Sequence, residues 1–409
     1  MLKKIIAFPL AMLLMLACFT GCDLKFWSKD TTADTDESIP DTTTEEPGTT
    51  DENTDKMPNQ KPVATRYSVT ANTPGIKVLG VRHQPADDRL DLDWACSGLE
   101  FAVDLEDGNI RFDFSLTGYC NLRVWIDGQV YMKDDDPIFV IGPTYNSLTL
   151  TNVEAGQHMI RLVKINDYST CRISLGSITF IGTILENVTD AERYIEFVGD
   201  EITTGLGNVG NHGSIYEDQD SSLTYAYMLA QAVNADYSIT ALNGQGLITG
   251  NPGLDKAYLY ADPFDNMNEQ YAFARKANLV VVNVGTVDFS RDVGEDAFKA
   301  AYLELIEMIR EKNGAVCNIL CLYNAVNDTY KNAILAACEE FGGEAEGVYT
   351  FELARAAGVA PTAEEHAAYA EALRSKVNEL STPFTPAFGD ITSGDGDKDF
   401  IDWNAGADA

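Results

Sequence analysis

Two adjacent carboxylates lie in a turn that follows an apolar, β-rich run. Asp200 and Glu201 come directly after Tyr194–Gly199 (Y-I-E-F-V-G), and Thr203 follows in the same Gly-containing turn. A carboxylate can act as a general acid or base, and it is a nucleophile in glycosidases and phosphoryl-transfer enzymes. Because loops at the ends of buried strands commonly carry function, the sequence predicts a site at this turn. The alternative is that Glu201 is a solvated carboxylate without a chemical role.

Three further segments hold groups that the fold could bring to this turn. Asn243 and Gly244 follow a predicted strand, Asp288 follows a second one, and His366 lies in a predicted helix. Ligand sites of open α/β sheets lie at the carboxyl ends of the strands. We therefore expect a ligand-binding cluster that consists of Asp200, Glu201, Thr203, Asn243, Gly244, Asp288 and His366.

The elements that must position this cluster alternate between strands and helices from Arg193 onward. Near-continuous β-branched runs predict parallel strands that are covered on both faces, and apolar residues at helical spacing predict the helices between them. The last helix is predicted to begin at Thr362, where Thr362 and Glu365 form a capping box. These patterns predict a three-layer α/β domain with a parallel sheet. Helices are expected from about Asp220 to Ala232 and over Phe298–Lys312, and strands over Tyr237–Leu242, Asn278–Gly285 and Val316–Tyr323.

The first half of the folded chain reads as strands without helices. Strand-like runs fill the segment between about Tyr67 and Leu185, several of them alternate strictly between apolar and polar residues, and turn signals such as Asp127-Gly128 separate them. This pattern is typical of a β-sandwich. Trp94 lies within an alternating strand, so we expect it in the core, with a sugar-stacking platform as the alternative.

Residues 199–207 resemble the first block of the SGNH-type esterases, the GDSL superfamily, and most closely that of carbohydrate esterase family 2. In that family a strand ends in G-D-S-I-T-x-G-x-G, and here the segment reads G-D-E-I-T-T-G-L-G. The first half is similar to the N-terminal jelly roll of the same family at Leu90–Trp94 (L-D-L-D-W) and Lys164–Asp167 (K-I-N-D). The resemblance covers nearly the whole folded chain. It implies a jelly-roll domain, then an SGNH hydrolase-like domain with an ester-hydrolysing site.

The residues that would perform this chemistry are replaced. Glu201 stands where the family has the nucleophilic serine, and Val287 stands where the G-T-N-D block has an oxyanion-binding asparagine. Ala357 and Ala360 take the places of the orienting acid and the general base of the D-x-x-H-P block, whereas Gly244, a backbone oxyanion donor, is retained. A hydroxyl nucleophile needs a base to accept its proton, and both are missing from these positions. The sequence therefore predicts a catalytically degenerate protein, a pseudoenzyme.

The first 63 residues precede the folded part of the chain. Residues 1–22 hold two lysines, a short apolar run and a final cysteine, a pattern that resembles a lipoprotein signal peptide with Cys22 as the lipid anchor. Cys18 is a second candidate, and an ordinary secretion signal is the alternative. Residues 23–63 are rich in Thr, Asp, Glu and Pro, so we expect a disordered acidic stalk. These segments predict an extracytoplasmic lipoprotein, anchored to the membrane on a bacterial cell surface.

Composition limits the partners. The formal net charge of −34 argues against nucleic acid and anionic lipid, which need basic surfaces, and leaves a carbohydrate polymer or a cation. We expect a β-sandwich at 64–186, an SGNH-like α/β domain at 187–382 and an acidic tail at 383–409. Three cysteines fall in each domain, which predicts free thiols or one bridge in each domain, and their spacing predicts no metal site.

The tail holds aspartates in a Gly-rich run that resembles half of a dockerin repeat or a related calcium loop. Calcium prefers several oxygen ligands from a turn with a glycine at its sharp point. The alternative for this segment is a disordered acidic tail, and no other cofactor is predicted. The candidate calcium ligands are Asp390, Asp395, Asp397, Asp399 and Asp402.

Three functions are compatible with the sequence. The first, which we favour, is a surface lipoprotein whose degenerate esterase domain binds a glycan in the former active-site cleft. The second is a structural or assembly protein of the surface that has no glycan ligand. The third is an active carbohydrate esterase of the acetylxylan type, which the resemblance would imply if the catalytic positions were intact.

Overall fold

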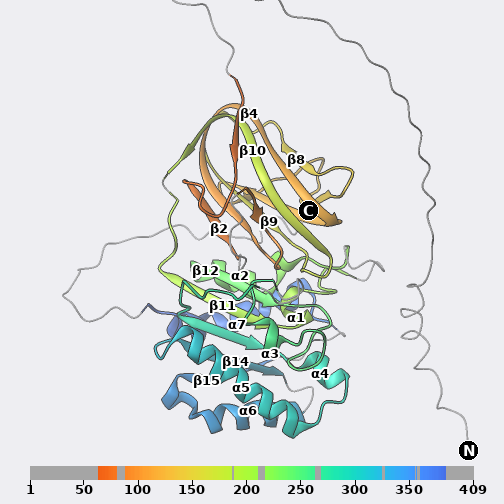
Figure 1. Ribbon diagram of the computed structural model, residues 1–409, viewed down its shortest axis with the longest axis vertical. Helices are drawn as coiled ribbons and strands as arrows, with labels where there is room; N and C mark the ends of the chain where they lie inside the picture. The colour runs from red at the N-terminus through yellow and green to blue at the C-terminus, as the bar shows by residue number, and fades with distance from the viewer. Residues whose placement is uncertain are drawn as a thin grey trace, which may run out of the picture. The chain divides into compact units, whose positions relative to one another are not determined.

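The computed structural model describes residues 63–80, 88–186, 188–210, 217–262, 269–324, 328–354, 356 and 360–383. They form an antiparallel β-sandwich followed by an α/β domain with a parallel sheet (Figure 1), as predicted. No helix within these residues is long and apolar enough to cross a bilayer. Cys22, the stalk, Ala357 and the aspartates of the tail lie outside the described residues. The expectations about them stay predictions.

The strands of the sandwich are β1 (Thr65–Ser68), β2 (Ile76–Leu79), β3 (Leu90–Asp91), β4 (Gly98–Gly118), β5 (Cys120–Ile126), β6 (Gln129–Val130), β7 (Phe139–Ile141), β8 (Ser147–Leu150), β9 (Gly156–Lys164) and β10 (Cys171–Leu185). The long strand β4 organises them. Its first half pairs with β2 and β9, its second half pairs with β8, and β10 pairs along both halves. Inward-pointing residues of β4 such as Phe101, Ile110 and Phe112 are fully buried, so the alternation that predicted the sandwich builds its core.

The α/β domain consists of β11 (Arg193–Gly199), α1 (Glu201–Thr204), the 3₁₀ turn η1 (Ser221–Leu223), α2 (Tyr225–Ala232), β12 (Ala235–Ala241), α3 (Leu254–Ala257), β13 (Leu279–Asn283), α4 (Thr286–Ser290), α5 (Glu295–Asn313), β14 (Asn318–Asn324), α6 (Asp328–Phe341), the 3₁₀ turn η2 (Gly343–Glu346), β15 (Val348–Leu353) and α7 (Ala363–Leu380). The strand order in the sheet is β12-β11-β13-β14-β15, and every neighbouring pair is parallel. All five strands therefore direct their carboxyl ends to the same edge.

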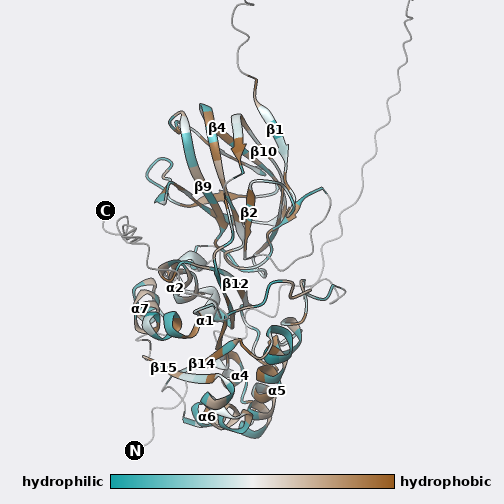
Figure 2. Ribbon diagram, turned by 90° about the vertical axis from the view of Figure 1, so that its left-hand side faces the viewer, coloured by the Kyte–Doolittle hydropathy of each residue, from teal (hydrophilic) through white to brown (hydrophobic). Residues whose placement is uncertain are grey.

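Two helical layers cover this sheet. α2 packs against α7 on one face, and α5 packs against α6 on the other (Figures 1 and 2). Side chains of β11 alternate between the faces: Ile195 and Phe197 join the core under α2 and α7, and Tyr194 and Val198 join the core under α5 and α6. Because both faces are covered, a central strand such as β13 can be apolar on both sides, which explains its near-continuous hydrophobic run L-V-V-V-N.

Two element boundaries differ from the sequence-based prediction. The helix expected from Asp220 to Ala232 is divided into η1 and α2. Asp220 Oδ1 accepts the Ser222 N–H at 2.9 Å, and Thr224 has an extended backbone and caps α2, so two successive caps interrupt the helix. α5 begins at Glu295, earlier than expected, because acidic residues in a first turn stabilise a helix N-terminus.

Two local predictions are confirmed. Thr362 Oγ1 accepts the Glu365 N–H at 3.2 Å, and Glu365 Oε2 accepts the Thr362 N–H at 2.8 Å, so the capping box is present. Trp94 is 1% exposed, as expected of a core residue. Its Nε1 donates to the Ala261 carbonyl at 2.8 Å. Trp94 thus also joins the sandwich to the α/β domain.

The six cysteines of the described residues are free and buried. In the sandwich Cys120 is in hydrogen-bonding contact with Cys171, and in the α/β domain Cys321 is in the same contact with Cys338. Burial raises the pKa of Cys120 well above its ordinary value, which favours the neutral thiol. Of the two alternatives predicted from sequence, the structure has free thiols.

A buried ion pair also joins the two domains. The Arg123 guanidinium on β5 lies 2.6 Å from the Asp220 carboxylate, and the exposed fractions of the two side chains are 11% and 0%. Removing the guanidinium leaves a buried carboxylate without its cation. We predict that Arg123→Met lowers the free energy of unfolding by about 3 kcal/mol, measured by urea denaturation.

The matched control is Arg111→Met on β4. The Arg111 guanidinium lies 2.8 Å from the Asp113 carboxylate, but 54% of the arginine side chain is exposed. Loss of this surface pair should cost less than about 1 kcal/mol. Equal losses in the two variants would show that the Arg123 pair does not join the domains in the way that we describe.

Candidate functional site

The turn after β11 is held in place by the Asp200 carboxylate. Asp200 is 1% exposed and caps the short helix α1, since its Oδ1 accepts the Ile202 N–H at 3.2 Å. Its Oδ2 accepts the Thr286 N–H, at the start of α4, at 3.0 Å. Burial raises the pKa of Asp200 to about 6, although both N–H groups favour the charged form. One side chain therefore connects the turn after β11 to the turn after β13.

The Asp288 carboxylate orders the loop that follows β12. Asp288 is fully buried in α4, and it accepts the N–H groups of Leu247 at 2.6 Å and Ile248 at 3.2 Å. The N–H and the hydroxyl of Thr249 donate to it at 3.2 and 3.0 Å. These bonds compensate for the removal of the carboxylate from water. The hydrogen-bonding capacity of the Asp288 carboxylate is thus taken up by this loop.

Asn243 and Gly244 lie at the start of the same loop, shortly after β12. The Asn243 N–H donates to Asp167 Oδ2 of the sandwich at 3.0 Å, and its Oδ1 accepts the Thr204 hydroxyl. Gly244 has a φ of +66°, and a Cβ there would meet no atom within 4 Å, so the space beside it is open. The Gly244 carbonyl accepts from the Arg291 guanidinium at 3.0 Å.

The Glu201 carboxyl group lies among these donors. Burial and, second, the Asp200 carboxylate raise the pKa of Glu201 to about 8. Hydrogen bonding from the backbone N–H groups of Glu201 and Gly244, together with the charge of Arg291, limits this rise. Glu201 Oε2 is buried and has no hydrogen-bond partner among the described residues. The group therefore holds a proton at neutral pH and faces the backbone donor that the family uses for an oxyanion.

Thr203 and His366 are buried around Tyr225. The Thr203 hydroxyl lies 3.0 Å from the Tyr225 hydroxyl, and His366 Nδ1 accepts the Tyr225 N–H at 3.3 Å. Thr203 and His366 are both 0% exposed, and burial lowers the pKa of His366 to about 4. The structure thus places these two predicted residues in the interior, whereas the other five predicted residues surround the turn.

Val287 and Ala360, two of the positions that the sequence predicts to be degenerate, carry apolar side chains. Val287 is 4% exposed in α4. Ala360 lies beside Gly207, where an added Cβ would stand 3.3 Å from the Ala360 Cβ. Neither side chain can donate a hydrogen bond or accept a proton. The site can therefore form hydrogen bonds to hydroxyl or carbonyl groups of a ligand through Glu201, Gly244 and Arg291.

Two residues of this site were not predicted. Asp167 belongs to the K-I-N-D segment of the sandwich, but nothing in that segment indicates that its carboxylate binds a loop of the other domain. Arg291 follows α4, where a lone exposed arginine carries no sequence signal. Only the tertiary contacts bring Asp167 and Arg291 to the Asn243–Gly244 segment.

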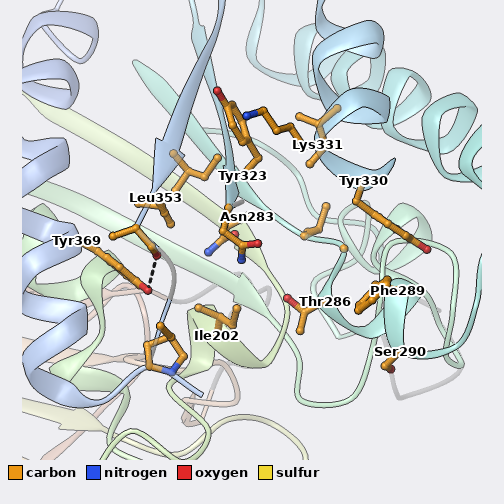
Figure 3. Close-up of a pocket in the computed structure, with 18 residues that line it drawn as sticks. Ile202, Asn283, Thr286, Phe289, Ser290, Tyr323, Tyr330, Lys331, Leu353 and Tyr369 are labelled. Atoms are coloured by element: carbon orange, nitrogen blue, oxygen red, sulfur yellow. Dashed lines mark hydrogen bonds between the residues drawn. The ribbon is translucent and has the colours of Figure 1, made fainter. Parts of the chain in front are cut away.

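A cavity of about 350 Å³ adjoins the turn at the carboxyl ends of β13, β14 and β15 (Figure 3). Ile202 of α1, the neighbour of Glu201, is part of its wall. The one signal in the sequence is a polar residue at the end of an otherwise apolar strand, L-V-V-V-N. The sequence did not predict the principal side chains of the cavity wall, which are Asn283, Phe289, Tyr330, Lys331 and Tyr369.

The raised pKa of Glu201 predicts how stability depends on pH. The folded protein binds this proton more tightly than the unfolded chain, whose ordinary pKa is 4.5. The resulting stability is present below about pH 4.5 and is lost as the pH rises through 8. Glu201→Gln cannot ionise. We therefore expect it to exceed the wild type in free energy of unfolding by about 1 kcal/mol or more at pH 8.5, and by less at pH 5.

Urea denaturation at a series of pH values measures this difference. The matched control is Glu192→Gln, which changes an exposed carboxylate just before β11. It should leave the pH dependence of the wild type unchanged. If Glu201→Gln followed the wild type over the whole pH range, the account of a buried, protonated Glu201 would be wrong.

Comparison with known proteins identifies the relatives of this chain. Residues 197–406 match the GDSL-like Lipase/Acylhydrolase family. An acetylxylan esterase / glucomannan deacetylase of Cellvibrio japonicus is 24% identical over 214 residues, which are 47% of this chain and 59% of that protein. The cellulase/esterase CelE of Acetivibrio thermocellus is 30% identical over 203 residues, 45% of this chain and 24% of that protein. The chain thus matches only part of the length of both.

Solved structures share the fold at low identity. A family two carbohydrate esterase from Cellvibrio japonicus has a TM-score of 0.68 and 18% identity, and the match covers 78% of this chain and 99% of that one. A family two carbohydrate esterase from Clostridium thermocellum, in complex with cellohexaose, has a TM-score of 0.65 and 22% identity over 75% and 98% of the two chains. The fold is that of a carbohydrate esterase family 2-like protein. With more than half of its residues matched, the chain belongs to the GDSL-like lipase/acylhydrolase family.

Proposed function

We propose that this protein is a surface-anchored lipoprotein that binds a glycan without hydrolysing it. The observation that carries the proposal is the Glu201 carboxyl group, which takes the place of the nucleophilic serine and faces the Gly244 N–H. Ala360, beside Gly207, takes the place of the general base. The backbone frame of an esterase site is kept, while its reacting groups are absent.

The chemistry of ester hydrolysis supports this reading. A serine hydroxyl attacks the ester carbonyl while a base removes its proton, and N–H donors stabilise the oxyanion that forms. A carboxylate at the same place would form a mixed anhydride, and Glu201 holds its proton at neutral pH because of burial. The loss of one oxyanion donor, as at Val287, costs roughly 10²- to 10³-fold in rate. Turnover by the route of the family is therefore not expected.

The relatives support a polysaccharide as the ligand. One is named an acetylxylan esterase and glucomannan deacetylase, and another was solved in complex with cellohexaose. The net charge of −34 also favours a neutral polymer over a polyanion. The exposed Arg291 guanidinium can donate to sugar hydroxyl groups, and the protonated Glu201 can donate or accept. Together these groups could bind one edge of a sugar chain.

The amino-terminal segments support a location on the cell surface. Cys22 ends a lipoprotein-like leader, and residues 23–63 form the acidic stalk in this proposal. A flexible coil of roughly 40 residues spans on the order of 35 Å, enough to separate a domain from its membrane anchor. The proposal also includes calcium binding by the aspartates of the tail as one role of that segment. The alternatives are a surface assembly protein without a glycan ligand and an active acetylxylan-type esterase.

Affinity gel electrophoresis tests the proposal. The protein should migrate more slowly in native gels that contain soluble arabinoxylan or glucomannan than in gels without polysaccharide. Arg291→Ala should reduce this retardation severalfold, because it removes the guanidinium beside Gly244.

The control is Arg374→Ala on α7, whose exposed guanidinium lies 3.1 Å from the Glu371 carboxylate on the neighbouring turn. It should bind as the wild type does. Absence of retardation with every neutral polysaccharide would contradict glycan binding and favour the assembly alternative. Equal retardation of both variants would place the glycan away from Arg291.

A further inference from the structure

The cavity at the carboxyl ends of β13, β14 and β15 has the features of a second, separate ligand site. Its volume of about 350 Å³ falls at the lower end of the range for small-molecule pockets, about 300–1,000 Å³. Figure 3 shows Asn283 at its centre, with Leu353 and Tyr369 on one side and Tyr330 and Phe289 on the other. Asp200, Glu201 and Gly244 are not among the residues of its wall.

The Asn283 amide is the strongest sign of a ligand. Asn283 is 8% exposed and its Nδ2 is buried; the amide is in hydrogen-bonding contact with the Tyr225 hydroxyl, which leaves one of its two N–H groups without an acceptor among the described residues. A buried donor destabilises a fold unless something supplies an acceptor. Two hydroxyl groups of the cavity wall already donate to backbone carbonyls. The Tyr330 hydroxyl donates to the Val293 carbonyl at 2.8 Å, and the Tyr369 hydroxyl donates to the Ala354 carbonyl at 2.9 Å.

Lys331 gives one end of the cavity a positive charge. Its ammonium lies 5.3 Å from the centre of the Tyr323 ring and 3.6 Å from the Glu352 carboxylate. The Lys331 side chain is 27% exposed and that of Glu352 is 45% exposed, so this pair is weak and open to competition. A second carboxylate that enters the cavity could therefore bind the same ammonium.

Aromatic rings form the opposite wall. Phe289 is 44% exposed. Its ring packs edge-on against the Tyr330 ring, with 5.6 Å between the two ring centres. Flat apolar faces of this kind bind planar rings through stacking or edge contacts. No Asp or Glu is among the described residues of the cavity wall. A ligand that brings its own acceptor matches a wall whose available polar groups, Asn283 and Lys331, are donors.

We propose that this cavity binds a small aromatic carboxylate. The ring lies between Phe289 and Tyr330 on one side and Leu353 and Tyr369 on the other, and the carboxylate accepts hydrogen bonds from Asn283 Nδ2 and Lys331 Nζ. This ligand supplies the acceptor that Asn283 lacks. The inference goes beyond glycan binding and does not depend on it, because the proposed donors Asn283 and Lys331 are distinct from Glu201, Gly244 and Arg291, the groups proposed to bind the glycan.

Calorimetric titration with cinnamate tests the proposal, with cinnamamide as the neutral probe of the same shape. Wild-type protein should bind cinnamate and should bind cinnamamide about tenfold more weakly, because a neutral amide carbonyl is a weaker acceptor than a carboxylate for the Lys331 ammonium. Lys331→Met keeps the aliphatic stem and removes the charge, so it should also weaken cinnamate binding about tenfold.

Lys376→Met is a closely matched control. Its ammonium lies 4.6 Å from the Tyr349 ring centre and 3.7 Å from Glu379, and its side chain is also 27% exposed, but it does not belong to the cavity wall. Cinnamate binding should be unchanged in this variant. Equal weakening by both lysine variants, or cinnamamide binding as tight as cinnamate, would overturn the proposal.

Asn283→Leu provides a test that a merely structural role would not pass. Leucine keeps the branched shape of asparagine and removes the donor that lacks an acceptor, so the melting temperature of the ligand-free protein should not fall, while cinnamate binding should weaken about tenfold or more. A lower melting temperature with unchanged cinnamate affinity would mean that Asn283 is a structural residue and would overturn its role as a ligand donor.

Discussion

The buried carboxylate of Asp288 is the interaction on which the site depends. It accepts two backbone N–H groups from Leu247 and Ile248 and both donors of Thr249, and so draws the loop after β12 onto α4. Asp200 does the same for the turn after β11 through its bond to the Thr286 N–H. Parallel strands bring three loops to one edge of the sheet, but these two carboxylates determine how the loops meet. Loss of either would leave buried donors unsatisfied.

Under the proposed function, these different roles of the residues explain how an esterase frame can exist without esterase chemistry. The residues that hold the frame, Asp200 and Asp288, bind backbone groups and stabilise the fold in their own right. The positions of the asparagine donor and the general base, Val287 and Ala360, carry no polar contact. Substitutions at such positions cost catalysis and leave the architecture intact. Glu201 fits the same frame, since its carboxyl group lies against the backbone donors of the former oxyanion site.

The sandwich takes part in this arrangement. Asp167 binds the Asn243 N–H across the domain boundary, and Arg123 pairs with Asp220, the cap of η1. The Tyr237 hydroxyl of β12 donates to the Cys96 carbonyl at 2.8 Å. The loop that carries Gly244 is therefore supported from both domains. The sandwich and the α/β domain also share a hydrophobic cluster, so more than a covalent connection joins them.

The sequence predicted what depends on local pattern. The strand that ends at Gly199, the capping box at Thr362 and the core position of Trp94 all follow from spacing and residue type, whereas the short helix α1 in the predicted turn was not predicted. The cavity around Asn283 could not be predicted, because its wall comes from several helices and strands that are distant in sequence. Burial around Tyr225 likewise separates His366 from the turn, and helical spacing alone does not reveal which buried partner a histidine meets.

The most direct test of the central claim is the release of acetate from a small acetyl ester and from acetylated xylan. Four forms are compared: the wild type, Glu201→Ser, Glu201→Ala, and the double variant Glu201→Ser/Ala360→His. The account predicts background rates for the wild type and for Glu201→Ser, which lacks a base, and a rate above background for the double variant. Hydrolysis by the wild type that Glu201→Ala abolishes would contradict it, and would assign Glu201 a catalytic role.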